Sequence, residues 1–109
     1  MFVKTYSYHV QPGRLQEMLA IQERVCRAYA RHVSVRSVLL KNREDPARCL
    51  EIQWFTDEQA FKDGMEAVNN NEEVSELWEA FQDTLVPGGQ IIVEGTFEQI
   101  WASGSPQAR

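Results

Sequence analysis

The sequence contains few residues of the kinds that form disulfides or zinc sites. Two cysteines, Cys26 and Cys49, occur in a helix-like and a strand-like pattern, and each is expected to be a buried, reduced thiol in a cytosolic chain. The two histidines, His9 and His32, have no further Cys or His nearby, so nitrogen and sulfur ligands cannot complete a zinc site. We therefore expect neither a disulfide nor a bound metal.

Long apolar runs and targeting signals are also missing. No apolar run approaches the roughly 20 residues that span a membrane, and residues 1–5 lack the basic, apolar and small-residue order of a secretory signal. The motifs typical of dinucleotide-binding proteins, P-loop NTPases, serine hydrolases and zinc proteases do not occur either. We expect a cytoplasmic protein with no membrane association.

Positive charge is the minority charge, because 11 lysines and arginines stand against 16 aspartates and glutamates, for a net charge of −5. Arginines are concentrated in the first half of the chain, but acidic residues interrupt them and no set of stacking aromatics accompanies them. Nucleic-acid binding needs a clustered basic surface. We therefore interpret these arginines as solvated faces and expect no nucleic-acid partner.

The clearest local pattern is a strand that changes into a helix between Cys49 and Phe61. Alternation over 49–55 predicts a strand with two different faces. One face carries Leu50, Ile52 and Trp54, and the other carries Glu51, Gln53 and Phe55. Thr56 and Gln59 have the spacing of a capping box, which predicts the start of a helix. We expect the first face to pack against helices and a possible pocket, and the second to face a partner subunit.

The remaining patterns complete one domain, with period-two alternation for strands and three- and four-residue spacing for helices. The predicted elements are strands at 2–10, 33–40, 49–55 and 90–101 and helices at 15–29, at 57 onward with an interruption at 69–71, and at 72–85 with Asn71 as cap. This β-α-β-β-α-β order predicts a ferredoxin-like α+β fold, a four-stranded antiparallel sheet with helices on one face. We expect residues 1–102 to form the domain and 103–109 a flexible tail.

The other face of such a sheet has no helices, and we expect Val35, Leu39, Phe55 and Ile92 to lie on it. A second copy of the chain is the simplest cover for an apolar face of this kind. The sequence therefore predicts a homodimer that packs sheet against sheet, with the long last strand extending across the partner.

Three segments carry a family resemblance: Val10-Gln11-Pro12-Gly13 after the first strand, the run 53–61, and the glycine-rich start of the last strand. Together with the hairpin between them, they resemble the antibiotic biosynthesis monooxygenase-like domain of the dimeric α+β barrel superfamily. The resemblance covers about residues 2–101 and implies a dimeric barrel. Members include cofactor-independent monooxygenases of polycyclic phenols or quinols, haem-degrading enzymes, and proteins without known activity.

The haem-degrading branch has a signature that this sequence lacks. That signature is an asparagine on the first strand, a tryptophan early in the helix after the third strand, and a later histidine that ligates iron. The matching positions here hold Tyr6, Gly64 and Trp78, and no histidine follows His32. We therefore expect no haem and no other cofactor.

The cofactor-independent branch needs only a pocket that promotes deprotonation of the substrate and holds the resulting anion. Tyr6, Tyr8, Trp54 and Trp78 are the candidate lining residues, with Arg36 offering positive charge to a phenolate. The alternative is that these aromatic side chains simply fill the core. The sequence identifies no catalytic residue directly.

His9 is a candidate acid or base. It lies on the face of the first strand opposite Tyr6 and Tyr8. Glu51 and Glu94 could share its face, and a histidine with a carboxylate can exchange protons near neutral pH. The alternative is that His9 is a structural hydrogen-bond donor at the dimer interface.

Two functional hypotheses follow from the sequence. The first is a small, dimeric, cofactor-independent monooxygenase that binds an aromatic phenol or quinol. The alternative is a non-catalytic dimeric module with a ligand-binding or structural role. A cavity beside the aromatic residues would favour the first over a closed core.

Overall fold

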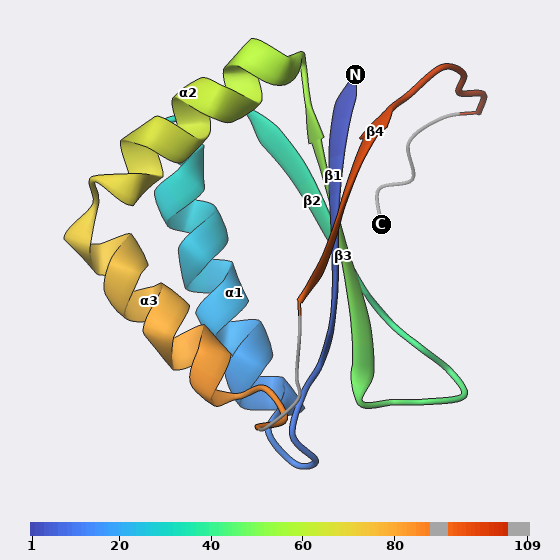
Figure 1. The fold of residues 1–109 in the computed structure, drawn as a ribbon, viewed down its shortest axis with the longest axis vertical. Helices are drawn as coiled ribbons and strands as arrows, with labels where there is room; N and C mark the ends of the chain where they lie inside the picture. The colour runs from blue at the N-terminus through green and yellow to red at the C-terminus, as the bar shows by residue number, and fades with distance from the viewer. Residues whose placement is uncertain (88–91, 105–109) are drawn as a thin grey trace.

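The computed structural model describes residues 1–87 and 92–104. Its elements are β1 (Phe2–His9), α1 (Leu15–Ala30), β2 (Val35–Lys41), β3 (Arg48–Phe55), α2 (Glu58–Asn69), α3 (Glu72–Asp83) and β4 (Val93–Glu98). All three helices lie on one side of the sheet (Figure 1). The predicted ferredoxin-like α+β order is confirmed, including the division of the second helical region into α2 and α3.

The four strands form one antiparallel sheet in the order β2-β3-β1-β4. Tyr6 of β1 lies opposite Glu51 of β3 and Glu94 of β4, at the centre of the sheet. β4 is shorter than the strand predicted at 90–101, because it ends at Glu98. The beginning of that predicted strand, 90–91, lies outside the described residues, as does the predicted tail from 105 onward.

The second and third helices begin at side-chain caps. The Asp57 carboxylate accepts a hydrogen bond from the backbone N–H of Ala60 at 2.8 Å, so Asp57, and not the predicted Thr56, is the N-cap of α2. A carboxylate also suits the positive end of the helix dipole better than a hydroxyl does. Asn71 caps α3 by accepting from the N–H of Val74 at 3.1 Å, which confirms that prediction.

The two faces of β3 are oriented opposite to the prediction. Cys49, Glu51, Gln53 and Phe55 are buried on the helix side, whereas Leu50, Ile52 and Trp54 lie on the uncovered side. Alternation could not decide the orientation, since both faces carry apolar residues. Residues directly opposite each other in an antiparallel pair share a face. Tyr8 packs edge-to-face on Phe81 of α3, and its partner Cys49 therefore turns inward with it.

The uncovered face of the sheet is apolar, but other residues form it than those predicted. The four predicted residues lie on the helix side instead. Phe55 is buried there, and Val35 lies opposite it in the β2–β3 pairing. Leu39 lies opposite the buried Glu51, and Ile92 lines the cavity described below. The exposed apolar side chains on the uncovered side are Leu40 (46% exposed), Leu50 (37%), Val93 (64%) and Phe97 (56%). Trp54 also lies there, with the Arg36 guanidinium 4.6 Å from the centre of its ring system.

Two groups of side chains pack between the sheet and the helices. Tyr8, Met18, Leu77 and Phe81 belong to the main cluster, and Phe2, Phe55 and Phe61 form an aromatic group toward α2. Cys49 is buried, as predicted, but the prediction for Cys26 was wrong because it is exposed on α1. None of the helices in the described ranges combines the length and apolar character needed to cross a bilayer.

Candidate functional site

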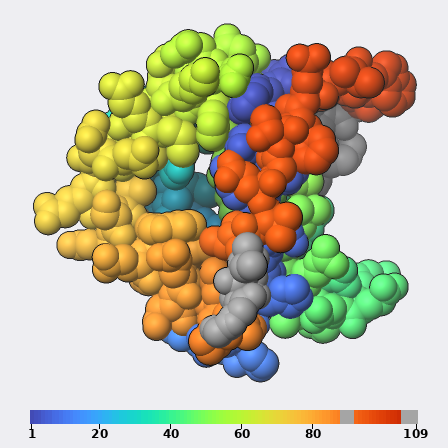
Figure 2. Space-filling model, viewed as in Figure 1, coloured from blue at the N-terminus to red at the C-terminus, as the bar shows by residue number. Residues whose placement is uncertain are grey.

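A cavity of about 300 Å³ lies between the sheet and the helices. Figure 2 shows the molecule hollowed between the yellow and orange helices and the strands. Every helix and the strands β1 and β3 contribute to its lining, which comprises Tyr6, Tyr8, Gln22, Val25, Tyr29, Glu51, Gln53, Met65, Val68, Asn69, Val74, Ser75, Trp78, Phe81 and Ile92. Its size is at the lower end of the range of small-molecule sites.

One buried carboxylate, Glu51, is the centre of the polar side of the cavity. It is 9% exposed and accepts hydrogen bonds from Gln22 Nε2 at 2.9 Å, Gln53 Nε2 at 2.8 Å and the Tyr8 hydroxyl at 3.4 Å. Burial raises the pKa of Glu51, and the hydrogen bonds from Gln53, Gln22 and Tyr8 oppose that rise. Since burial outweighs these hydrogen bonds, Glu51 is a stronger base than an exposed carboxylate.

Three tyrosines surround this carboxylate. Burial raises the pKa of Tyr6, Tyr8 and Tyr29, to about 12 for Tyr29, and the charge of Glu51 adds to the rise in each. Glu94 contributes further to the raised pKa of Tyr6. These tyrosines are therefore neutral phenols at physiological pH and can donate hydrogen bonds.

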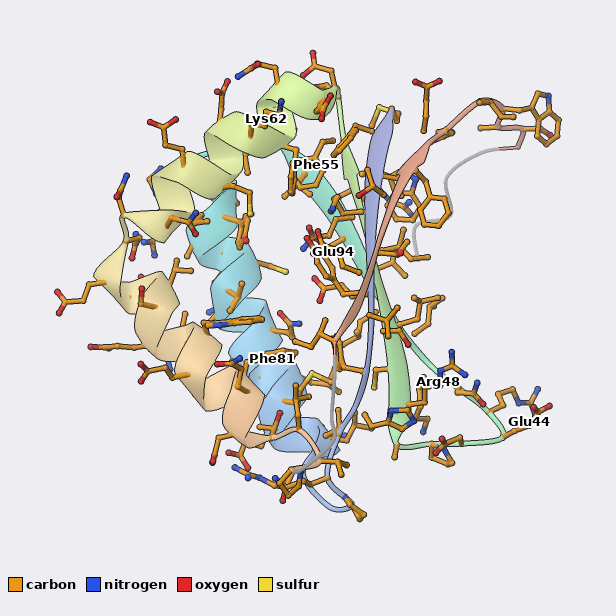
Figure 3. The ribbon with its side chains drawn as sticks, viewed as in Figure 1. Glu44, Arg48, Phe55, Lys62, Phe81 and Glu94 are labelled. Carbon is orange, nitrogen blue, oxygen red and sulfur yellow. The ribbon has the colours of Figure 1, made fainter. Side chains whose placement is uncertain are left out.

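The aromatic wall of the cavity comes from α3. Phe81 is 4% exposed, and its ring stacks on Trp78 with centroids 5.4 Å apart and an interplanar angle of 23°. Trp78 is 48% exposed and also lines the cavity, so it forms part of the rim. Figure 3 shows Phe81 on the sheet-facing side of α3. A flat apolar ligand could stack against this wall.

The structure brings together three of the five predicted pocket residues. Tyr6, Tyr8 and Trp78 line the cavity, whereas Arg36 and Trp54 stack on each other on the uncovered face of the sheet. Arg36 lies opposite Trp54 in the β2–β3 pairing, so the reversal of the β3 faces moves both away from the helices. A substrate role for the three cavity residues stays a prediction.

His9 does not pair with either predicted carboxylate. Glu51 and Glu94 lie opposite Tyr6, on the helix side, and His9 lies on the other side of β1. Its Nε2 is 3.3 Å from the Asp45 carboxylate in the loop between β2 and β3, and its side chain is 41% exposed. The proposed proximity to Glu51 and Glu94 is wrong, because it assumed the reversed face for Glu51.

Several polar cavity residues were not predicted, although the sequence contained a signal for one of them. Gln22 interrupts the apolar stripe of α1, and a polar residue in such a stripe needs a buried partner, which here is Glu51. Gln53 lies beside Glu51, and its Oε1 has no hydrogen-bond partner in the part of the chain that the structure describes. Within residues 1–87 and 92–104, no group of three or more His, Cys, Asp or Glu side chains could hold a metal ion.

Comparison with known proteins finds similarity only at the level of structure. No protein-family model matches the chain, and no curated protein matches it in sequence. SnoaB, a cofactor-independent oxygenase from Streptomyces nogalater, superposes with a TM-score of 0.72 at 17% identity, over 93% of this chain and 94% of that one. A structure of an antibiotic biosynthesis monooxygenase gives 0.69 at 12% identity, over 92% and 99%. A conserved protein from Methanosarcina mazei gives 0.65 at 11% identity, over 87% and 91%.

Proposed function

We propose that this chain, whose fold is that of the antibiotic biosynthesis monooxygenase-like domains, is a cofactor-independent monooxygenase of an aromatic phenol or quinol. The observation that carries the proposal is a cavity that combines an aromatic wall with one buried carboxylate. The cofactor-independent oxygenase among the structural neighbours supports the same chemistry.

The proposed reaction begins with proton transfer to Glu51. A substrate hydroxyl that hydrogen-bonds to Glu51 gives up its proton to the carboxylate, and in our proposal Tyr6 and Tyr29, which line the same cavity, donate hydrogen bonds to the resulting anion. The electron-rich anion passes one electron to O₂, and the radical pair combines into a C–O bond. The peroxide then breaks down to a carbonyl and water. Overall the O–H of the phenol, the ring C–H at the carbon where oxygen adds, and O₂ become a quinone and H₂O, so the substrate supplies all four electrons.

A second, smaller cavity offers a route by which the proton can leave Glu51. A smaller cavity of about 200 Å³ is lined by Leu19, Cys26 and Ser37, and it also reaches Gln22 and Glu51. It lies between α1 and β2, so it approaches the carboxylate from a different direction than the larger cavity does. In our proposal, Glu51 returns its proton to solvent through this opening while the product still occupies the larger cavity.

The experiment that tests this function is oxygen consumption by purified protein with a panel of hydroquinones and anthrones. The wild type should exceed the spontaneous rate with at least one substrate, and Glu51→Gln should lose about 100-fold or more of that excess, as expected for loss of a general base. Glu44→Gln is the matched control, because Glu44 lies in the β2–β3 loop away from the cavity (Figure 3). Circular dichroism establishes that each variant is folded.

The result would also separate the two functional hypotheses. If no substrate in the panel raises oxygen consumption above the spontaneous rate, the monooxygenase proposal fails and a non-catalytic ligand-binding module is favoured. If the wild type is active and Glu51→Gln retains full activity, the oxygenase assignment stands but Glu51 is not its base.

We also propose that the chain forms a homodimer through the uncovered face of the sheet. The exposed Leu40, Leu50, Val93 and Phe97 support this, because an apolar patch of this kind on a small protein usually marks an interface. The domains that this chain resembles form a dimeric barrel, in which two sheets also pack face to face. A monodisperse monomer at micromolar concentration in light scattering would contradict it.

A cytoplasmic location is a further part of the proposal. The two cysteines are free thiols, and one of them, Cys26, is exposed. Free, exposed thiols are more usual in a reducing compartment. Fractionation of cells that express the tagged chain would test this location.

A further inference from the structure

The charge of the cavity lining is one-sided. Among its 15 described lining residues, Glu51 is the only aspartate or glutamate, and none is lysine, arginine or histidine. The donors that approach the Glu51 carboxylate are two amides and one phenol, so no positive charge compensates it directly. A buried negative charge without a cationic partner is costly and attracts positive charge.

Lys4, a buried cation of the same sheet face, is paired with another carboxylate. Lys4 is 5% exposed on the helix side of β1, where it forms an ion pair with Glu94 and donates to Thr96 Oγ1 at 2.7 Å. Its ammonium also lies 5.2 Å from the centre of the Phe61 ring. Figure 3 shows Glu94 on the helix side of β4. The Lys4 charge is therefore directed toward β4 and α2, and it leaves the negative character of the cavity in place.

The rest of the lining suits a positively charged group. Tyr6, Tyr8, Tyr29 and Trp78 present aromatic rings, and the faces of such rings attract cations. The Glu51 carboxylate has about four acceptor positions and receives three hydrogen bonds, so it can accept another. Gln53 Oε1, beside it, has no donor among the described residues. Within the described ranges, the polar side of the cavity thus has unused acceptor positions on Glu51 and Gln53, and a donor on a ligand can fill them.

We infer that this cavity selects aromatic ligands by charge: it prefers a ligand with a protonated amine, accepts a neutral hydroxyl-bearing one less tightly, and rejects one with a carboxylate. This inference deepens the proposed function. It rests on that function for the reaction of the ligand, whereas the binding preference stands without it. A substrate in this class is a phenol or quinol whose ring bears an aminoalkyl substituent. The ammonium would donate to Gln53 Oε1 beside Glu51, with the ring against Trp78 and Phe81, and the carboxylate stays available to accept the substrate hydroxyl.

The test uses three ligands with the same ring and different charge: naphthylmethylamine, naphthalenemethanol and naphthoate. Isothermal titration of the full-length wild-type chain at neutral pH and low salt gives their dissociation constants. We expect the amine to bind roughly tenfold or more tighter than the alcohol, and the carboxylate roughly tenfold or more weaker, since a charge pair a few ångströms apart in a partly buried site is worth at least that factor. Equal affinities of amine and carboxylate, or no binding by any of the three, would overturn the inference.

Glu51→Gln identifies the group responsible. In this variant the affinities of the amine and the carboxylate should approach each other, whereas Glu44→Gln should keep the wild-type order. If Glu51→Gln does not fold, the order in the wild type still decides the inference. The two proposals fail separately: a wild-type charge order without oxygen consumption contradicts only the monooxygenase, and oxygen consumption without a charge order contradicts only the charge selection.

Discussion

Phe81→Ala is the substitution for which the structure gives the clearest expected magnitude. Phe81 is 4% exposed, meets Tyr8 edge-to-face at 5.0 Å and stacks on Trp78 at 5.4 Å. Buried Phe→Ala changes cost about 3–5 kcal/mol. One side of the Phe81 ring faces an existing cavity, where it has fewer contacts to lose, so we expect about 3 kcal/mol, the lower end of that range.

Urea denaturation followed by tryptophan fluorescence measures this cost. With a denaturant slope of about 1.5 kcal/mol per M, the unfolding midpoint should fall by roughly 2 M. Protein concentrations must be matched, because the proposed dimer would make stability depend on concentration. Trp78→Ala is the control: Trp78 is 48% exposed, so its loss should cost about half as much, roughly 1.5 kcal/mol. A cost below about 1 kcal/mol for Phe81→Ala, or a larger cost for Trp78→Ala, would refute the packing argument.

Four further predictions concern the base, the helix cap and the uncovered face. Burial raises the pKa of Glu51, so kcat/KM for oxygen consumption should rise with pH through a pKa above the ordinary carboxyl range. Glu51→Gln should lose this rise, and a flat wild-type profile would count against Glu51 as the base. For stability the sign is opposite, because the contribution of Glu51 is fully present below its unfolded-state pKa and is lost as pH rises through the raised folded-state pKa. The urea midpoint of the wild type should therefore fall relative to that of Glu51→Gln as the pH rises from acidic to neutral. At the start of α2, Asp57→Ala should cost about 1 kcal/mol in urea denaturation and Thr56→Ala less than about 0.5 kcal/mol; equal costs would contradict the cap. On the uncovered face, Leu50→Lys should give a monomer in light scattering. The control is Leu19→Lys on α1, which should leave the dimer intact although Leu19 is equally exposed, at 37%. The same mass for both variants would place the interface elsewhere.

The elements of the fold were predictable because each has a local signal. The stripe of α1, the Asn71 cap of α3 and the alternation around Ile52 each depend on a few neighbouring residues. The order of strands and helices then restricts the topology to very few arrangements. The cap of α2 was misplaced by one residue because Thr56 and Asp57 are both good capping residues, and only the geometry chooses between them.

The site was only partly predictable, because it depends on which way each strand faces. Tyr6 and Tyr8 were correctly expected to point toward the helices, but strand alternation gives no absolute direction for β3. The pairing of Tyr6 with Glu51 settles that direction, and this register is set across a sequence separation that local patterns do not describe. The error moved Trp54 and Arg36 into the expected pocket and left Glu51 out of it.

The corrected orientation also shows an unusual distribution of polarity across the sheet. On β3, Glu51 and Gln53 are buried toward the helices, with Lys4 beside them on β1, whereas Leu50 and Trp54 lie on the side without helices. A sheet in a monomeric domain would gain stability from the opposite arrangement, with leucine and tryptophan inside and the charged residues in water. Polar groups that are buried at a cost to stability are common at functional sites.

Both sides of this sheet therefore need something that the single chain does not supply. The outer side has exposed apolar side chains, for which a second copy is our proposed cover. The inner side has, within the part of the chain that the structure describes, the unpartnered Gln53 Oε1 and the uncompensated Glu51 charge, for which a cationic ligand is our proposal. If both proposals hold, ligand binding and dimerisation act on opposite faces of the same strand. Leu50 and Glu51 are adjacent residues, so movement of β3 on dimer formation would shift the carboxylate in the cavity. Affinity for naphthylmethylamine should then be weaker in monomeric Leu50→Lys than in the dimeric wild type, whereas equal affinity would mean that the two faces act independently.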